Sequence, residues 1–237
     1  MTEITLILPH YNQPLILARQ MEEIEKYPEG MKVIVVDDGS KEIPEVLPQV
    51  DLYRIEIDQP WNRGQARNIG AYVCETEWLI QVDTDHILPA ECIEPLLAFE
   101  ADPMHWYRFP RFRVGRADET RKKDKLHHMK KFGRIHEHID SYLMTRGMFF
   151  TSPYDEYFSG CLGGGSPFLA RMTQIHGKPL MLPDDIHLHV HTRHSVADAS
   201  ITELSRDREE YSKRRKQRAD CAPTEILMHP WHKVDHG

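Results

Sequence analysis

The segment Leu79–Leu88 reads LIQVDTDHIL, an apolar run that stops at two aspartates separated by one residue. A short apolar run that ends in polar turn residues is typical of a strand buried on both faces. Carboxylates directly behind such a strand lie at its carboxyl end, where open α/β sheets bind their ligands. The segment therefore predicts a buried strand over Trp78–Val82, followed by a ligand-binding turn at Asp83-Thr84-Asp85, the DxD turn.

Outward from this segment, the first hundred residues alternate between strand-like and helix-like patterns. The expected strands are Ile4–Leu8, Val33–Val36, Leu52–Ile57 and Trp78–Val82; one expected helix carries Leu17, Met21 and Ile24, and another carries Ala66, Ile69 and Val73. Repeated strand-helix-strand units imply right-handed crossovers and a mainly parallel sheet. We therefore expect an α/β fold with helices flanking that sheet.

Polar clusters follow three of these strands. They are His10, Tyr11 and Asn12 after the first strand, Asp37 and Asp38 after the second, and Asp83 and Asp85 after the fourth. Each cluster alone is explained by ordinary polar turn residues. Three clusters at the same edge of one parallel sheet indicate a ligand site.

The DxD turn has the chemistry of a metal site for a diphosphate. A nucleoside diphosphate gains negative charge when it leaves a sugar, and a hard divalent cation bridging its phosphates offsets that charge. One or two protein carboxylates suffice, because phosphate oxygens and water complete the coordination shell. We expect Mn2+ or Mg2+ here.

The segments LILPHYNQP, VIVVDDGS, NRGQARNIGA and LIQVDTDHIL resemble, in order and spacing, the nucleotide-binding half of family 2 GT-A glycosyltransferases, over about residues 4–90. The resemblance implies a GT-A fold: a mainly parallel sheet flanked by helices, a smaller acceptor-side subregion and a C-terminal helix. It divides the chain into a nucleotide-sugar-binding half (1–100), an acceptor-binding half (101–195) and a C-terminal basic helix and tail (196–237). The implied activity is metal-dependent transfer of a sugar from a nucleotide-diphosphate donor to an acceptor hydroxyl.

The resemblance also implies roles for single residues. The donor-binding residues would be Pro9, Tyr11, Asn12, Asp38, Arg63, Arg67 and Asp83, and the direct metal ligand would be Asp85. Tyr11 would pack near the donor base and Asp38 would hydrogen-bond it, which suits an aromatic face beside a carboxylate. Arginines at a helix start suit phosphate. The alternative for Arg67 is that it only caps and solvates its helix.

Three histidines, His187, His189 and His191, alternate along an expected strand over Ile186–His194 and so share one face. They fit a self-contained zinc site. They also fit the resemblance, in which a late histidine completes the metal site; His191 is then the first choice and His189 the second. Solvent-facing histidines on an edge strand are the third reading.

The family pattern breaks at PYDEYFSGCLGGG, Pro153–Gly165. In the family this Gly-rich loop ends in Glu-Asp, and in inverting members the closing acid is the general base. Here Ser166 follows the glycines, and the acid pair is missing. Asp155 or Glu156 could take over as the base, the enzyme could be retaining, or the chain could bind a donor without turning it over. Asp184 and Asp185 are further candidates.

Composition limits the class of protein. The 237 residues are 40% hydrophobic, enough for one sizeable core, and the net charge of -7 argues against a protein that coats nucleic acid. No apolar run is long enough for a membrane helix, and the N-terminus lacks the features of a signal peptide. The scattered cysteines indicate free thiols. We expect a cytoplasmic protein, free or peripheral at the inner membrane face.

Basic residues cluster between Arg111 and Arg134 and again at Lys213–Arg218, near the aromatic residues Trp106, Tyr107 and Phe109. Such clusters bind polyanions, or they simply form a solvated surface. The acceptor is therefore left open among a saccharide, a lipid, a protein and a nucleic acid.

Two other functions compete. A catalytically silent GT-A module would bind a nucleotide sugar or a polyanion, and the missing acid pair favours it. A nucleotidyltransferase would need a Gly-rich, Arg-containing loop after the first strand, where this chain has Pro9-His10-Tyr11-Asn12.

Overall fold

The structure is a computed structural model that describes residues 3–59, 62–114, 133–135, 140–159, 165–191, 208–218, 223 and 225–235. Its strands are β1 (Ile4–His10), β2 (Met31–Asp37), β3 (Asp51–Ile55), β4 (Trp78–Gln81), β5 (His86–Ile87), β6 (Tyr107–Arg108), β7 (Arg111–Val114), β8 (Gly133–Ile135), β9 (Tyr142–Thr145), β10 (Leu180–Met181), β11 (Leu188–His191) and β12 (Trp231–Val234). Its helices are α1 (Pro14–Ile24), α2 (Arg63–Val73), α3 (Ile93–Ala98), α4 (Arg146–Phe150), α5 (Gly165–His176) and α7 (Arg208–Arg218), with 3₁₀ helices η1 (Ala90–Cys92) and η3 (Glu156–Phe158).

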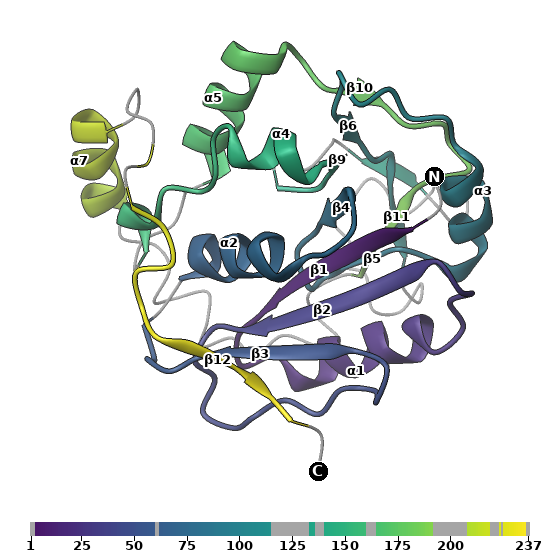
Figure 1. Cartoon of the computed structure of the whole chain (residues 1–237), viewed down its shortest axis with the longest axis horizontal. Helices are drawn as coiled ribbons and strands as arrows, with labels where there is room; N and C mark the ends of the chain where they lie inside the picture. The colour runs from purple at the N-terminus through teal and green to yellow at the C-terminus, as the bar shows by residue number, and fades with distance from the viewer. Residues whose placement is uncertain are drawn as a thin grey trace, which may run out of the picture.

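The main sheet has eight strands in the order β10-β6-β9-β4-β1-β2-β3-β12 (Figure 1). Strands β4, β1, β2 and β3 run parallel to one another, so their carboxyl ends meet at one edge. The predicted parallel sheet is confirmed, and the four predicted strands are all present in it. Strand β9 pairs antiparallel with both β4 and β6.

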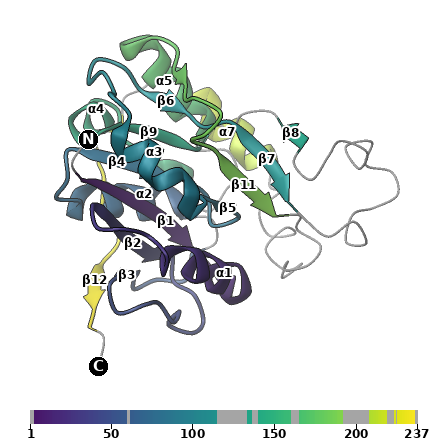
Figure 2. The same ribbon diagram turned by 90° about the vertical axis from the view of Figure 1, so that its right-hand side faces the viewer.

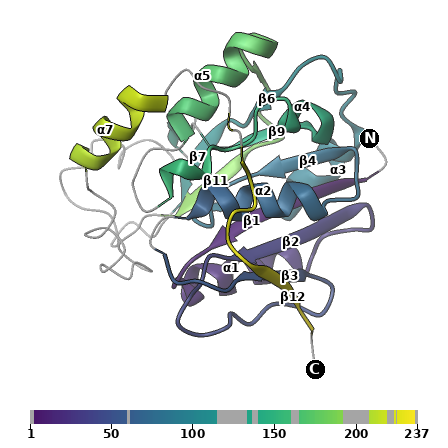
Figure 3. The same ribbon diagram turned by 60° about the vertical axis from the view of Figure 1, so that its left-hand side comes forward.

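Helices cover both faces of this sheet. Successive residues of β1 point to opposite faces: Leu6 and Leu8 belong to the core that holds α1 and α3, whereas Ile7 belongs to the core that holds α2, α4 and α5. In Figure 3, α2 lies in front of the sheet and α1 behind it. Strand β1 is buried on both faces, which agrees with its mostly apolar sequence; its one polar residue before Pro9, Thr5, hydrogen-bonds to Thr76.

A second, smaller sheet has the order β5-β11-β7-β8 and projects beside the main sheet (Figure 2). Strand β11 pairs parallel with β7 and antiparallel with β5. Strand β5 begins directly after the DxD turn, so the histidine-bearing β11 lies beside that turn. The predicted strand over Ile186–His194 is confirmed for Leu188–His191, which carries His189 and His191; His187 lies just before it.

The C-terminal segment returns to the first half of the molecule. After α7 it crosses α2, and then β12 pairs antiparallel with β3 at the sheet edge (Figure 3). Gln65 of α2 donates to the His229 carbonyl, and Trp231 makes edge contacts with Tyr53 and Tyr72. The sequence did not predict this strand. Through the pairing of β12 with β3, the main sheet joins the last ten residues of the chain to strands from its first hundred residues.

Helix α7 carries one of the two predicted basic clusters; residues 192–207, which include the expected start of this helix, lie outside the described residues. Arg214 donates to the carbonyls of Tyr157 and Ser159, and Tyr157 donates to Gln217. Part of this cluster therefore docks α7 on η3. Residues 115–132, which hold most of the other basic cluster, lie outside the described residues.

Within the described residues, every helix is too short or too polar to span a lipid bilayer. Cys74 and Cys92 are free and buried. Cys161 and Cys221 lie outside the described residues.

Candidate functional site

The turn after β1 is joined to the turn after β2. The backbone N–H of Asn12 donates to Ser40 Oγ at 2.8 Å, and the N–H of Lys41 donates to Asn12 Oδ1 at 3.0 Å. Asn12 has a φ of 49°, a left-handed conformation that asparagine tolerates better than most residues. Tyr11 donates to Asp58 at 2.7 Å, and burial together with this carboxylate raises the pKa of Tyr11 to about 12.

The two acids of the turn after β2 have different environments. Asp37 accepts from Arg54 at 2.6 Å and from His10 at 3.2 Å. The backbone N–H of Gln13 donates to His10 Nε2, so His10 carries its proton on Nδ1 and donates it to Asp37. The carboxylate of Asp37 therefore stabilises the fold, and it holds the ends of β1, β2 and β3 together.

Asp38 is 2% exposed. Its Oδ1 has no hydrogen-bond partner among the described residues, although the N–H of Asn62 donates to this carboxyl group. Burial first, and then the neighbouring Asp37, raise the pKa of Asp38 well above its usual range. A buried acceptor of this kind carries a desolvation cost that a ligand N–H would offset.

The DxD turn is fixed from two sides. The Thr84 hydroxyl donates to the carbonyl of Pro9, and Gln20 of α1 donates to the carbonyls of Thr84 and His86 at 2.8 and 2.9 Å. Pro9 thus positions the turn through its backbone. Potential ligand atoms of Asp83, Asp85 and His86 all lie within 4.8 Å of one another.

His86 is the weakest of these three as a ligand, since both of its ring nitrogens have partners. Arg111 lies 2.8 Å from Nε2, which must accept, so Nδ1 donates to Ser141 Oγ at 3.2 Å. The two aspartates are partly exposed and supply oxygen atoms, the ligand type that Mg2+ and Mn2+ prefer. These carboxylates fit a hard divalent cation.

Arg63 and Arg67 of α2 reach the DxD turn from the neighbouring helix. Arg67 is fully buried, donates to Asp83 at 2.5 Å and stacks over the ring of Tyr154 at 5.5 Å. Arg63 lies 3.4 Å from Asp83 and 2.8 Å from Asp140. Burial alone would lower the pKa of Arg63. The negative charges of Asp140 and Asp83 raise this pKa by more than burial lowers it, so the guanidinium stays charged.

Asp140 is a candidate that the sequence did not reveal. It is fully buried and accepts from the Tyr154 hydroxyl at 3.0 Å. A Cβ added to Gly165 would lie 2.1 Å from Asp140 Oδ1, so the carboxylate fills the space that a side chain at position 165 would take. Gly165 closes the loop that lacks its acid pair. An acid just before the apolar run of β9 was the one available signal.

Asp155 and Glu156, the two predicted catalytic acids, have structural partners. Asp155 accepts from the N–H of Tyr157 at 3.1 Å and caps η3. Glu156 is buried, and it accepts from Asn68 at 2.8 Å and from the N–H groups of Leu227 and Met228 at 2.7 and 2.9 Å. Both oxygens of Glu156 are therefore used to attach the C-terminal segment to α2.

Replacing Glu156 by Gln should lower the free energy of unfolding by about 1–3 kcal/mol, because the new NH2 group would face a backbone N–H. Leu227, at a φ of 60°, would lose the contact that holds its strained backbone. Urea unfolding measures the effect, and Glu225→Gln, on an exposed residue of the same segment, is the matched control. Equal unfolding free energies for the two variants would contradict this role.

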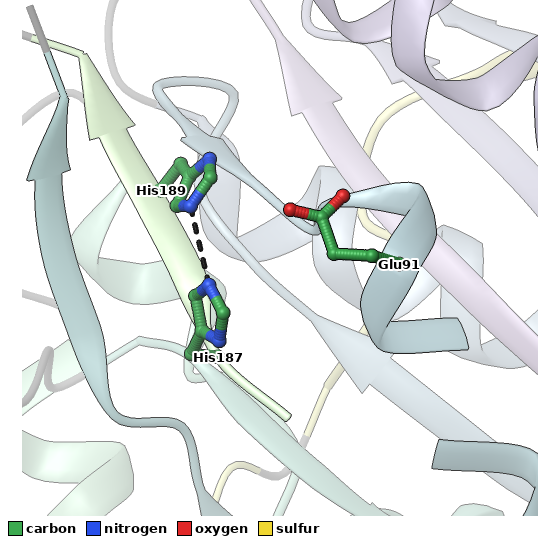
Figure 4. Close-up of side chains that lie close together, drawn as sticks. All are labelled: Glu91, His187 and His189. Carbon is green, nitrogen blue, oxygen red and sulfur yellow. Dashed lines mark hydrogen bonds between the residues drawn. The ribbon is translucent and has the colours of Figure 1, made fainter. Parts of the chain in front are cut away.

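Two of the histidines predicted for the metal site, His187 and His189, lie together in the structure. His189 Nε2 lies 3.2 Å from His187 Nε2, and these two rings group with Glu91 rather than with the DxD turn (Figure 4). Val190 pairs with His86 in the β11–β5 register, so His191 follows directly beside the DxD turn. The side chain of His191 lies outside the described residues.

Comparison with known proteins gives one family. The model described as "Glycosyl transferase family 2" matches residues 5–159. A protein of Haemophilus influenzae named "Uncharacterized glycosyltransferase" is 30% identical over 104 residues, which are 42% of this chain and 35% of the relative. The match thus spans about a third of that relative's length.

Solved structures show the same fold at low identity. The crystal structure of S. aureus TarS 1-349 in complex with UDP-GlcNAc has a TM-score of 0.56 at 14% identity, covering 85% of this chain and 64% of that chain. The mannosyltransferase PcManGT from Pyrobaculum calidifontis, in complex with GDP-Man and Mn2+, has a TM-score of 0.53 at 17% identity, covering 91% and 61%. The mainly parallel, helix-flanked GT-A sheet that the sequence predicts is confirmed.

Proposed function

This chain belongs to glycosyl transferase family 2, and on that premise we propose that it transfers a sugar from a nucleoside-diphosphate donor to an acceptor hydroxyl with the help of Mn2+ or Mg2+. The related structures support a donor of this class, because one holds UDP-GlcNAc and another holds GDP-Man with Mn2+.

The observation that carries the proposal is the position of Arg63. Its guanidinium lies 3.4 Å from Asp83, and its charge also interacts with the charges of Asp38 and Asp85. The acids at the ends of β2 and β4 therefore share one charged neighbour at the carboxyl edge of the sheet. A nucleoside diphosphate needs this arrangement: an acceptor for its base at one end, and positive charge at its phosphates.

We assign roles on this basis. Asp38 accepts from the donor base beside Tyr11 and Asn12, at the turn that β1 and its Pro9 lead into. Arg63 and Arg67 orient the phosphates, and exchange part of their pairing with Asp83 for pairing with the donor. Asp83 and Asp85, with His191, would hold the divalent cation, which supplies charge stabilisation to the departing diphosphate.

We further propose that Asp140 replaces the missing closing acid as the general base. Its carboxylate fills the space beside Gly165, the last glycine of the loop that ends in an acid pair in the family pattern. Arg63 and the Tyr154 hydroxyl orient it. When the donor draws Arg63 towards its phosphates, the Asp140 oxygen that Arg63 contacts here, Oδ2, would accept the proton of the acceptor hydroxyl. On this proposal Asp155 and Glu156 are structural: Asp155 caps η3, and Glu156 binds the backbone of Leu227 and Met228.

A thermal-shift screen with UDP-, GDP-, dTDP- and CMP-sugars tests the donor class. A donor at a hundred times its dissociation constant stabilises the fold by about 2.7 kcal/mol, which raises the melting temperature of a chain of this size by roughly 5–10 °C. We expect one base to give this shift, and Mn2+ to enlarge it.

Asp38→Ala should abolish the shift, whereas Asp235→Ala, a change on an exposed residue, should leave it intact. Equal shifts for all bases, or none for any donor, would contradict the proposed site. A selective shift without sugar release, even by slow hydrolysis, would identify a silent binding module.

A further inference from the structure

A second cluster of potential metal ligands lies outside the DxD turn. It consists of Glu91 on η1, His187 just before β11, and His189 within β11, with one ligand atom of each residue within 4.8 Å of the other two (Figure 4). All three side chains are at least partly exposed, so an ion can reach them. The donor chemistry assigned above uses none of the three.

The two imidazoles have the spacing of a metal-bound pair. Their Nε2 atoms are 3.2 Å apart. A tetrahedral zinc ion with bonds of about 2.0–2.1 Å would hold two nitrogens about 3.3–3.4 Å apart. In Figure 4 the two nitrogens face each other, and the Glu91 carboxylate lies to one side of the pair. Small side-chain adjustments would bring one ligand atom of each residue to a common ion.

The tautomer of His187 is the one that a metal requires. Its Nδ1 lies 2.9 Å from the carbonyl oxygen of Asp184, which can only accept, so Nδ1 carries the proton. The lone pair of Nε2 then points at His189. Donation of the second ring N–H to a backbone carbonyl is the usual way in which proteins orient a metal-binding histidine. Phe112 packs edge-on against the same ring at 4.9 Å and restricts its rotation.

Glu91 stands on an anchored element as well. Glu23 accepts from the N–H of Ala90 at 2.8 Å and fixes the start of η1. The Tyr27 hydroxyl donates to the carbonyl of Leu88 and holds the approach to η1. The three ligands are therefore presented by fixed backbone rather than by a long loop.

We propose that Glu91, His187 and His189 bind a zinc ion separate from the cation of the donor site. Imidazole nitrogens with one carboxylate suit Zn2+ better than Mg2+ or Mn2+, and three protein ligands leave a fourth position for water. Zinc replaces the proton between the rings, which moves to Nδ1 of His189. The ion ties η1 to β11, and through the β11–β5 pairing it stabilises the strand that leads out of the DxD turn.

Zinc alone is the probe, added to the full chain after removal of metals with a chelator. We expect one saturable site by calorimetry and a melting temperature that rises with zinc concentration. Manganese should give no comparable rise at this site. His187→Ala and His189→Ala should each abolish the saturable site, and Glu91→Gln should weaken it.

Matched controls separate this site from the donor site and from general surface binding. His105→Ala, at a half-exposed histidine beside Asp102, and Glu94→Gln, at an exposed residue of α3, should bind zinc as the parent does. Asp85→Asn should also keep the zinc site, so the result does not depend on the proposed transferase activity. Melting temperatures measured without zinc verify that each variant folds. Loss of zinc binding in Asp85→Asn, or its survival in both histidine variants, would overturn the proposal.

Discussion

Replacing Asp85 by Asn should reduce sugar transfer by roughly 10²–10³-fold, the largest loss that we expect from a change at the DxD turn. The substitution keeps the size of the side chain and removes its negative charge, so the cation loses a ligand while the turn keeps its anchors on Pro9 and Gln20. Turnover measured against Mn2+ concentration should need more metal to reach half its maximum.

Asp235→Asn, on an exposed residue distant in sequence, is the control and should transfer sugar at the parental rate. Melting temperatures should be close to the parental value for both variants. Undiminished turnover in Asp85→Asn, at any metal concentration, would remove the metal role assigned to this residue.

Asp140→Asn should lower turnover by about 10²–10⁴-fold, because general base catalysis contributes on this scale. Donor binding should survive, since the variant keeps the acids that face the base and the cation. A thermal-shift measurement with the selected donor therefore separates loss of the base from loss of the donor site. Asp155→Asn should have a much smaller effect on turnover.

Relocating the carboxylate is the sharper test, because Asp140→Asn also removes a buried partner of Arg63. In the double variant Asp140→Gly, Gly165→Asp, a side chain at 165 enters the space that Asp140 leaves. Turnover should recover above that of either single variant. Gly165→Asp alone should be unstable, because two carboxylates would compete for one space.

Failure of the double variant to recover, with its donor binding intact, would contradict Asp140 as the base and leave the rest of the site standing. Full activity in Asp140→Asn would do the same. An inverted anomeric configuration in the product, read by NMR, would agree with a general base.

The parts of the site that the sequence predicted are those that follow a strand directly. Asp38 and Asp85 stand at the ends of continuous apolar runs, so a local pattern fixed both their element and their edge of the sheet. Their convergence followed from the parallel order of β4, β1 and β2. The sequence could not show which of the two acids, Asp37 or Asp38, is left to bind a ligand. His10 and Arg54 bind Asp37, and only the folded structure brings them together with it.

The parts that were missed depend on tertiary contacts. Asp140 is separated from the DxD turn by several short elements, η1, α3, β6, β7 and β8 among them, and it meets Arg63 only after folding. Glu91 lies almost a hundred residues before His187, on a short 3₁₀ helix that has no sequence signature. The predicted face shared by His187 and His189 is confirmed, yet its third partner could not be inferred from spacing.

Strand β12 has a consequence for how the polypeptide folds as it leaves the ribosome. One edge of β3 can pair with β12 only after residues Trp231–Val234 have been synthesised, about 180 residues later in the chain. During that interval a nascent chain presents an open strand edge, a surface that pairs readily with other chains. Synthesis rate and chaperone access should therefore influence the soluble yield of this protein more than its final stability would suggest.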